Sequence, residues 1–308
     1  MSTPAANSRV HEYYELCKPR VVMLIVFTAV VGMFLAVPGL PPLSALLWGT
    51  LGIGLQASSA AAINQIIDRG IDARMARTCG RPLVTGTLGM TESIAFATVI
   101  GLAGFVLLWF AVNPLTAVLT QFALVGYAGI YTLFLKRATP QNIVIGGAAG
   151  AAPPVLGWAA VTGTVDPHAL ILFLIIFIWT PPHFWALAIE RHKEYADADV
   201  PMLPVTHGIA YTRTQVLLYT VLLFVGSLLP FVFGMSGVVY LAGAVLLSGR
   251  FLQYAIRLKY RPVPGLPMKT FGFSIVYLMG IFALLLVCLL YTSPSPRDLS
   301  TSRMPSSA

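Results

Sequence analysis

The sequence predicts an all-α, polytopic membrane protein in which nine transmembrane helices are bundled around a central cavity. Three observations predict this fold class: the composition, the length of the apolar segments, and the distribution of basic residues among the loops. Of the 308 residues, 57% are hydrophobic and only 10% are charged, whereas a soluble domain carries about 25% charged residues. The mean hydropathy is +0.82, and the composition therefore excludes a soluble protein.

Nine segments come close to the roughly 20 apolar residues that a spanning helix needs. The first is short because Pro38 closes it, and a break near Pro230 leaves open an alternative in which one helix is merged or dropped. The small residues from Gly146 to Ala152 predict close helix packing, or else a flat surface for a large planar ligand. The segments are expected at 21–37, 43–63, 93–112, 115–135, 142–161, 168–189, 213–234, 238–256 and 270–291.

The basic residues fall on one side of this arrangement. Nine spans place the N-terminus and every second loop on one side, and that side holds every Lys and Arg except Arg297 and Arg303. Such an imbalance marks the cytoplasmic side. We therefore attribute the net charge of +8 to basic residues that orient the protein in the membrane, and not to nucleic-acid binding. No removable signal peptide and no Arg/Ser-rich leader is visible. We therefore expect a bacterial cytoplasmic (inner) membrane, with the mitochondrial inner membrane as the alternative.

One domain is expected over residues 1–291. The tail at 292–308 is rich in Ser and Pro and has no apolar periodicity, so we expect it to be disordered, whether native or appended. The cysteines at 17, 79 and 288 have no metal-binding or redox spacing and are taken as ordinary apolar or interfacial residues.

A polar stretch follows the second apolar segment and carries the candidate chemistry. Asn64, Asp68 and Asp72 lie four residues apart, so on a helix they would share one face. Oxygen ligands suit Mg²⁺, which needs one or two carboxylates when substrate phosphates complete its shell. Arg77 and Arg81 follow, and guanidinium groups grip phosphate oxygens. The stretch predicts a magnesium–diphosphate site, and the alternative is a solvated loop whose charges pair with each other.

A second acidic cluster lies in a later loop on the same side. Glu190, Glu194, Asp197 and Asp199 follow the sixth apolar segment, and the first two have helical spacing. Ionised groups near a bilayer are costly, so they usually line a cavity or pair with one another. The two clusters could therefore face each other across the predicted cavity.

Several motifs along the chain resemble the protoheme IX farnesyltransferases, or heme O synthases, within the membrane prenyltransferase superfamily. The Asn/Asp spacing by itself indicates only the superfamily. The stretches Pro181–Trp185 and Pro201–Val205 narrow the resemblance to the heme branch. The motifs are Lys18-Pro19-Arg20, the array Asn64…Asp68…Asp72, Lys136-Arg137, Pro181-Pro182-His183-Phe184-Trp185 and Pro201-Met202-Leu203-Pro204-Val205.

The resemblance implies a reaction in which farnesyl diphosphate and protoheme give heme O and diphosphate. Mg²⁺ on Asn64, Asp68 and Asp72 would neutralise the diphosphate as its C–O bond breaks, and a heme vinyl group would attack the allylic cation. With Arg77 and Arg81, these three residues form the implied catalytic set. Preorganised donors would stabilise the leaving oxygens; the diphosphate-binding residues are expected to be Arg77, Arg81, Lys136, Arg137 and Lys193.

The resemblance also suggests a second metal contact and a heme subsite. Glu194 occupies the acidic position just before Tyr195, and we take it as a candidate ligand for a second metal or a water-bridged contact. His183, Trp185 and Tyr195 are the candidate heme contacts. For His183 the choice is open between an axial or propionate contact to heme and a histidine satisfied by a neighbouring backbone carbonyl.

The expected partners are farnesyl diphosphate, protoheme IX, the lipid bilayer, and a heme A synthase or assembly proteins of a terminal oxidase, with no nucleic acid. Three alternatives were weighed. A transporter should carry ionisable residues deep in several segments and on both sides of the membrane. In this chain they are concentrated on one side, which argues against transport. A non-catalytic heme-handling protein would not need the Asn/Asp array, and a prenyltransferase for a quinone or chlorophyll precursor is disfavoured by the segment around His183.

Overall fold

The computed structural model describes residues 6–292, with side chains over residues 9–289, and this part of the chain contains helices and no strand. Each predicted apolar segment is helical. The long helices are α2 (Pro19–Leu35), η1 and α3 (Ala45–Gly49 and Thr50–Asp72), α5 (Met90–Ala111), α6 with η2 and α7 (Pro114–Val125, Gly126–Leu135 and Lys136–Ala138), α8 and α9 (Asn142–Ala151 and Pro153–Thr162), α10 (Pro167–Glu190), α13 and α14 (Gly208–Gly226 and Leu229–Val232), α15 (Val238–Tyr260) and α16 (Leu266–Thr292).

Four short helices lie outside these spans: α1 (Ala6–Leu16), α4 (Pro82–Thr85), α11 (His192–Asp197) and α12 (Leu203–Thr206). Within residues 6–292, eight helices are long and apolar enough to cross a membrane. A ninth span results if α1 and α2, which meet at a bend of 52°, count together. The all-α, polytopic fold is therefore confirmed. The central cavity remains a prediction, as does the domain boundary at 291, and residues 293–308 of the expected tail lie outside the described part.

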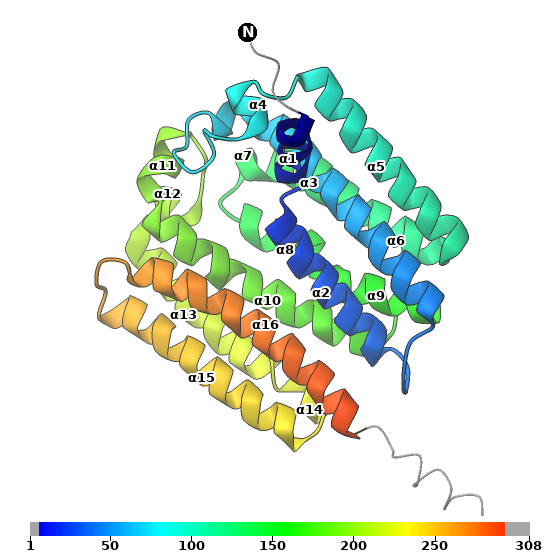
Figure 1. Ribbon diagram of the computed structural model, residues 1–308. Coiled ribbons are helices and arrows are strands. Elements are labelled where there is room, and N and C mark those ends of the chain that lie inside the picture. Colours follow the sequence, from blue (N-terminus) through cyan, green and yellow to red (C-terminus); the bar gives the residue numbers. More distant parts are fainter. Residues whose placement is uncertain (1–5, 293–308) are drawn as a thin grey trace, which may run out of the picture.

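The long helices pack side by side in a closed ring (Figure 1). Each helix of the ring contacts the next in the order α2, α3, α5, α6, η2, α8, α10, α13, α15 and α16, and α16 contacts α2. The α9 helix packs against α2, α6 and α10. The α10 span is the most enclosed of the eight, with 67% of its apolar window buried, so most residues of this part of α10 are surrounded by protein.

The small-residue face at the start of the fifth span packs closely, as predicted. A Cβ added to Gly147 would lie 3.0 Å from a side-chain atom of Thr180 on α10, and one added to Gly146 would lie 2.2 Å from the Tyr131 ring. Further along this span, a Cβ on Gly157 would lie 1.9 Å from the backbone oxygen of Ala29. Glycine is needed here because the backbones of α2 and α9 touch.

The second span is longer than predicted. The apolar pattern ends at residue 63, whereas α3 continues to Asp72. The Asn/Asp array therefore forms the last turns of a helix, where the sequence interpretation had placed Asp68 and Asp72 in a loop. Basic groups from elsewhere in the chain pair with these buried polar side chains, which offsets part of the cost of burying them.

Two loops at this end of the bundle, which we call the site end, pack against each other. Residues from the end of α3 and the loop after it, Ile71 and Met75, share one buried cluster with Tyr195, Val200 and Met202. Arg74 and Asp199 join the same two loops through a contact of 3.2 Å between Nη1 and Oδ2. The α3–α4 loop and the α10–α13 connection thus form one layer next to the array.

Candidate active site

The predicted face of oxygen ligands exists. Helix α3 places Asn64, Asp68 and Asp72 together, and their exposed fractions are 4%, 2% and 4%. The side chains are also connected, because Asn64 Nδ2 donates a hydrogen bond of 2.9 Å to Asp68 Oδ2. Asn64 Nδ2 donates a second one, of 3.0 Å, to Thr132 Oγ1 on η2. The burial of all three side chains contradicts a solvated loop, although Asp72 and Arg81 do pair with each other, as that alternative also expects.

Three basic side chains from three other segments pair with the array. Lys18 Nζ donates to Asn64 Oδ1, and Arg81 Nη1 donates to Asp72 Oδ2. Lys136 Nζ lies 2.6 Å from Asp68 Oδ2. Two carboxylates facing three cations leave a local charge of about +1 when all are ionised, and such a site attracts an anion.

One oxygen of the array has no partner. Asp68 Oδ1 is buried, and within residues 9–289 no donor reaches it. An unsatisfied buried carboxylate oxygen costs free energy unless a ligand takes it up. Two carboxylates and an amide oxygen form a donor set that suits a hard divalent cation. No three His, Cys, Asp or Glu residues in the described part lie close enough to hold a metal by themselves, so substrate oxygens would have to complete the shell.

Lys18 is a site residue that the sequence assignment missed. It precedes α2, and its backbone is left-handed, with φ at 51°, which directs the side chain onto Asn64. Burial, and after it the nearby charge of Arg81, lower the pKa of Lys18 to about 7. The Lys18-Pro19-Arg20 motif is the sequence signal that could have identified Lys18, since Pro19 begins the helix and sets the turn before it.

Lys136 and Thr132 reach the array because η2 is a π-helix. Thr132 Oγ1 donates to the backbone oxygen of Tyr127 at 2.8 Å and accepts from Asn64. Lys136 follows directly after η2, where it meets Asp68. π-helical turns are uncommon and often mark functional sites. The apolar pattern of the fourth segment gave no sign of this irregularity.

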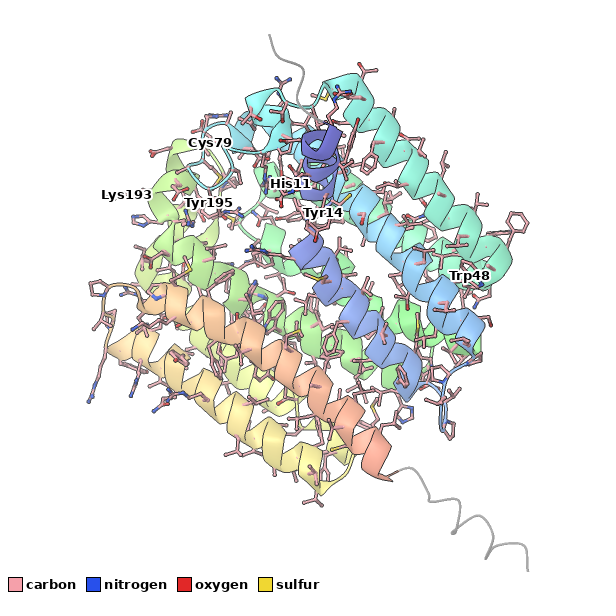
Figure 2. All side chains as sticks on the ribbon, in the orientation of Figure 1. His11, Tyr14, Trp48, Cys79, Lys193 and Tyr195 are labelled. Carbon is pink, nitrogen blue, oxygen red and sulfur yellow. The ribbon has the colours of Figure 1, made fainter. Side chains whose placement is uncertain are left out.

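The other predicted diphosphate ligands do not contact the array. Arg77 is exposed and makes a side-chain hydrogen bond with Tyr195, whose pKa is raised by burial. Arg137 and Lys193 are exposed, and neither forms an ion pair or a side-chain hydrogen bond within residues 9–289. Figure 2 shows Lys193 at the outer edge of the site end and Tyr195 further in. These ligand assignments remain predictions.

Glu194 pairs with a neighbour in place of joining the array. Its Oε1 lies 2.6 Å from Arg191 Nη1, while its buried Oε2 has no partner within residues 9–289. Asp199 is exposed and pairs with Arg74. The predicted contact of Glu194 with a second metal therefore remains a prediction.

The candidate heme residues are covered by protein. His183 is stacked between Trp179 and Phe271, with ring-centroid distances of 4.2 Å and 4.5 Å. Its Nδ1 lies 2.6 Å from Ser274 Oγ, so a hydroxyl satisfies this nitrogen, and not the backbone carbonyl of the second alternative. Both ring faces are occupied, and Phe184 adds a T-shaped contact at 4.8 Å.

Trp185 and Tyr195 lie together elsewhere. Both belong to the buried cluster next to the array that contains Ile71 and Met75. Trp185 is 2% exposed, packs edge-on against Tyr219 at 5.3 Å, and leaves its Nε1 donor without a partner in the described part. The structure thus separates His183, which contacts α16 residues, from the other two candidates.

The comparisons with known proteins agree on one family. The UbiA prenyltransferase family matches residues 25–278. A protein named protoheme IX farnesyltransferase from Methylococcus capsulatus is 59% identical over 284 residues, which is 92% of this chain and 95% of that protein. One of the same name from Nitrosococcus oceani is 62% identical over 276 residues, or 90% of this chain and 92% of that protein.

Solved structures show the same fold at low identity. A structure described as digeranylgeranylglyceryl phosphate synthase has a TM-score of 0.77 and 19% identity, and covers 92% of this chain and 99% of its own. A UbiA homolog from Archaeoglobus fulgidus bound to DMAPP and Mg²⁺ has a TM-score of 0.62 and 16% identity, with 90% and 99% covered.

Proposed function

The chain belongs to the UbiA prenyltransferase family, and we propose that it transfers the farnesyl group of farnesyl diphosphate to a vinyl group of protoheme IX, giving heme O. Two relatives with this name share 59% and 62% of their residues with the chain over most of its length. The observation that carries the chemistry is the buried Asn64–Asp68–Asp72 face, which is paired with three basic side chains and whose fully buried Asp68 Oδ1 has no partner within residues 9–289.

In this proposal Asn64, Asp68 and Asp72 hold Mg²⁺, which when bound neutralises charge on the diphosphate. These three residues would hold the ion, and Lys18, Arg81 and Lys136, which lie next to them, would donate to the diphosphate oxygens. Because these donors are already in place, they stabilise the charge that develops as the leaving oxygen departs.

The proposed group transfer balances with one water molecule. The C1–O bond of farnesyl diphosphate breaks, and its electron pair leaves with the diphosphate. The π electrons of the vinyl group form the new C–C bond to C1, and the cation that results on the heme side chain takes up water and releases a proton. The products are a hydroxyethylfarnesyl group, diphosphate and H⁺.

For the heme we propose the side of the array where Trp185 and Tyr195 lie, since their cluster adjoins α3. His183 would reach a heme only through Nε2, because its ring faces are covered. Arg77, Arg137, Lys193 and Glu194 are proposed to approach the substrate when it binds.

The proposed location is a bacterial cytoplasmic membrane, with the site end facing the cytoplasm. The concentration of Lys and Arg at the site end supports this orientation. We also propose that heme O passes to a heme A synthase or to proteins that assemble a terminal oxidase, which are the expected protein partners.

The test is a reaction with purified protein in detergent, protoheme and farnesyl diphosphate, with Mg²⁺ or with EDTA, analysed by mass spectrometry. The mass of heme O should form only with Mg²⁺. Prenylation of a quinone precursor without any heme O would instead assign the chain to another substrate. Binding of protoheme without any prenylation would indicate a heme-handling protein.

A further inference from the structure

A surface of α15, away from the array, combines positive charge with an open apolar groove. The groove has a volume of about 470 Å³. Leu252 and Ile256 form its apolar part, and Gly249 leaves its inner end open, because an added Cβ would meet nothing within 4 Å. Arg257 and Arg261 line its other end. One end of the groove is thus apolar and the other cationic.

The two arginines are not neutralised by the protein. Arg257 and Arg261 are exposed, and neither makes an ion pair or side-chain hydrogen bond within residues 9–289. No acidic residue occurs anywhere between Pro201 and Thr292, although this stretch carries six Lys and Arg residues. The α13, α15 and α16 helices that pack together here therefore offer these arginines no acidic partner, which leaves them available to an anion from outside the chain.

The stretch of α15 along the groove is about as long as one leaflet of the hydrocarbon core is thick. At about 1.5 Å per residue, the eleven steps from Gly249 to Tyr260 span about 16 Å, close to half of the roughly 30 Å hydrocarbon core. Tyr260 is 69% exposed at the cationic end, where aromatic rings commonly meet the lipid headgroups. In Figure 1, α15 ends at the site end of the bundle, near the turn into α16.

We propose that this surface binds one anionic phospholipid of the surrounding bilayer. Its phosphate-bearing headgroup contacts Arg257 and Arg261, and one acyl chain lies along Ile256, Leu252 and Gly249. Basic residues at the headgroup level attract anionic lipids in this way, and each Lys or Arg near an anionic membrane surface contributes about 1 kcal/mol.

Arg250 extends the positive charge deeper along the same helix. Its guanidinium lies 5.1 Å from the centre of the Tyr254 ring and contacts Gln253. Gln253 also lines the groove. Arg250 is already engaged by these neighbours, so Arg257 and Arg261 are the residues to change in a test.

The test is native mass spectrometry of the full-length protein, purified in detergent and titrated with phosphatidylglycerol or phosphatidylcholine. Wild type should hold one phosphatidylglycerol at concentrations where phosphatidylcholine does not bind. Each Arg→Gln change should weaken retention about fivefold, and the double variant Arg257→Gln/Arg261→Gln more than either alone. Lys269→Gln, which removes the same charge at an exposed residue of α16 outside the groove, should retain the lipid.

A second variant tests the acyl part without changing charge. Gly249→Leu fills open space in the groove, so it should lower lipid occupancy while the protein folds normally. Equal binding of the two lipids, or unchanged binding in the double variant, would overturn the proposal. So would a dimer that the double variant abolishes in the absence of any lipid adduct, since that would assign the surface to a second copy of the chain.

Discussion

At the scale of single residues, the two oxygens of the Asp68 carboxylate differ. Oδ2 accepts from Asn64 and Lys136, whereas Oδ1 is buried without a donor. This asymmetry fits the proposed Mg²⁺ site, in which the ion would take up the free oxygen. The spacing of the sequence could show that Asp68 shares a face with Asn64 and Asp72, but not that one of its oxygens is unpaired.

We expect Asp68→Asn to lower kcat for heme O formation by about 100-fold or more, because it removes a charge that the metal and Lys136 both need. The change preserves the shape of the side chain, so insertion and yield should be normal. Asp199→Asn is the matched control, since Asp199 is an exposed carboxylate paired with Arg74, and it should retain wild-type activity. Equal rates for the two variants would contradict the assignment.

The pKa of Lys18, lowered to about 7, predicts a pH dependence of substrate binding. Below pH 7 the free protein already holds the proton on Lys18. Above pH 7 it does not, whereas a bound diphosphate favours the charged amine. Binding then takes up a proton, so affinity should weaken as pH rises, approaching about tenfold per unit.

The dissociation constant of a non-reactive farnesyl diphosphate analogue, measured from pH 6 to 9, tests this linkage. Lys18→Arg remains charged throughout this range and should flatten the part of the profile above pH 7. The titration of the diphosphate itself is common to both proteins and cancels in the comparison. Parallel profiles for wild type and Lys18→Arg would show that Lys18 does not titrate on binding.

At the scale of elements, close contact between α2 and α9 fixes the frame of the site. The helix α2 starts next to Lys18, so any displacement of α2 moves a basic side chain that pairs with the array. An added Cβ at Gly157 would clash with the backbone oxygen of Ala29 at 1.9 Å, whereas Gly150 on the same span faces open space. Of these two glycines in one span, Gly150 thus has room for an added methyl group and Gly157 does not.

Gly157→Ala should therefore destabilise the protein by about 1–3 kcal/mol through overpacking. Gly150→Ala should be neutral or slightly stabilising, because it adds helix propensity without a clash. Thermal unfolding in detergent compares them, and Gly157→Ala should have the lower Tm. A Gly157→Ala variant as stable as Gly150→Ala would mean that the two helices lie further apart than described.

At the scale of the whole molecule, the ring of helices gathers the array and its basic partners at one end. The array, the two packed loops and the cationic end of the α15 groove all lie there (Figures 1 and 2). The opposite connections are short and carry no Lys or Arg. This polarity predicts that one membrane face reaches the site end and the other does not.

Labelling of exposed cysteines tests this orientation. Cys79 is exposed at the site end, and in a background with Cys17 and Cys288 replaced by Ser, an impermeant maleimide should label it in inverted vesicles but not in spheroplasts. Thr164→Cys, placed on the opposite connection in a background that also lacks Cys79, should give the reverse pattern. Labelling of Cys79 in spheroplasts would contradict a cytoplasmic site end.

The sequence by itself determined the helical membrane class, the positions of the nine segments and the common face of Asn64, Asp68 and Asp72, because hydropathy and a period of 3.6 residues are local properties. Only the tertiary structure decided which cations meet that face. Lys18 and Lys136 come from positions 46 and 68 residues away from their partners, while Arg137 and Lys193, equally plausible from charge, remain exposed. Contacts over such separations depend on how whole helices pack. The π-helix and the left-handed turn that direct these two lysines produce no periodic pattern in the sequence.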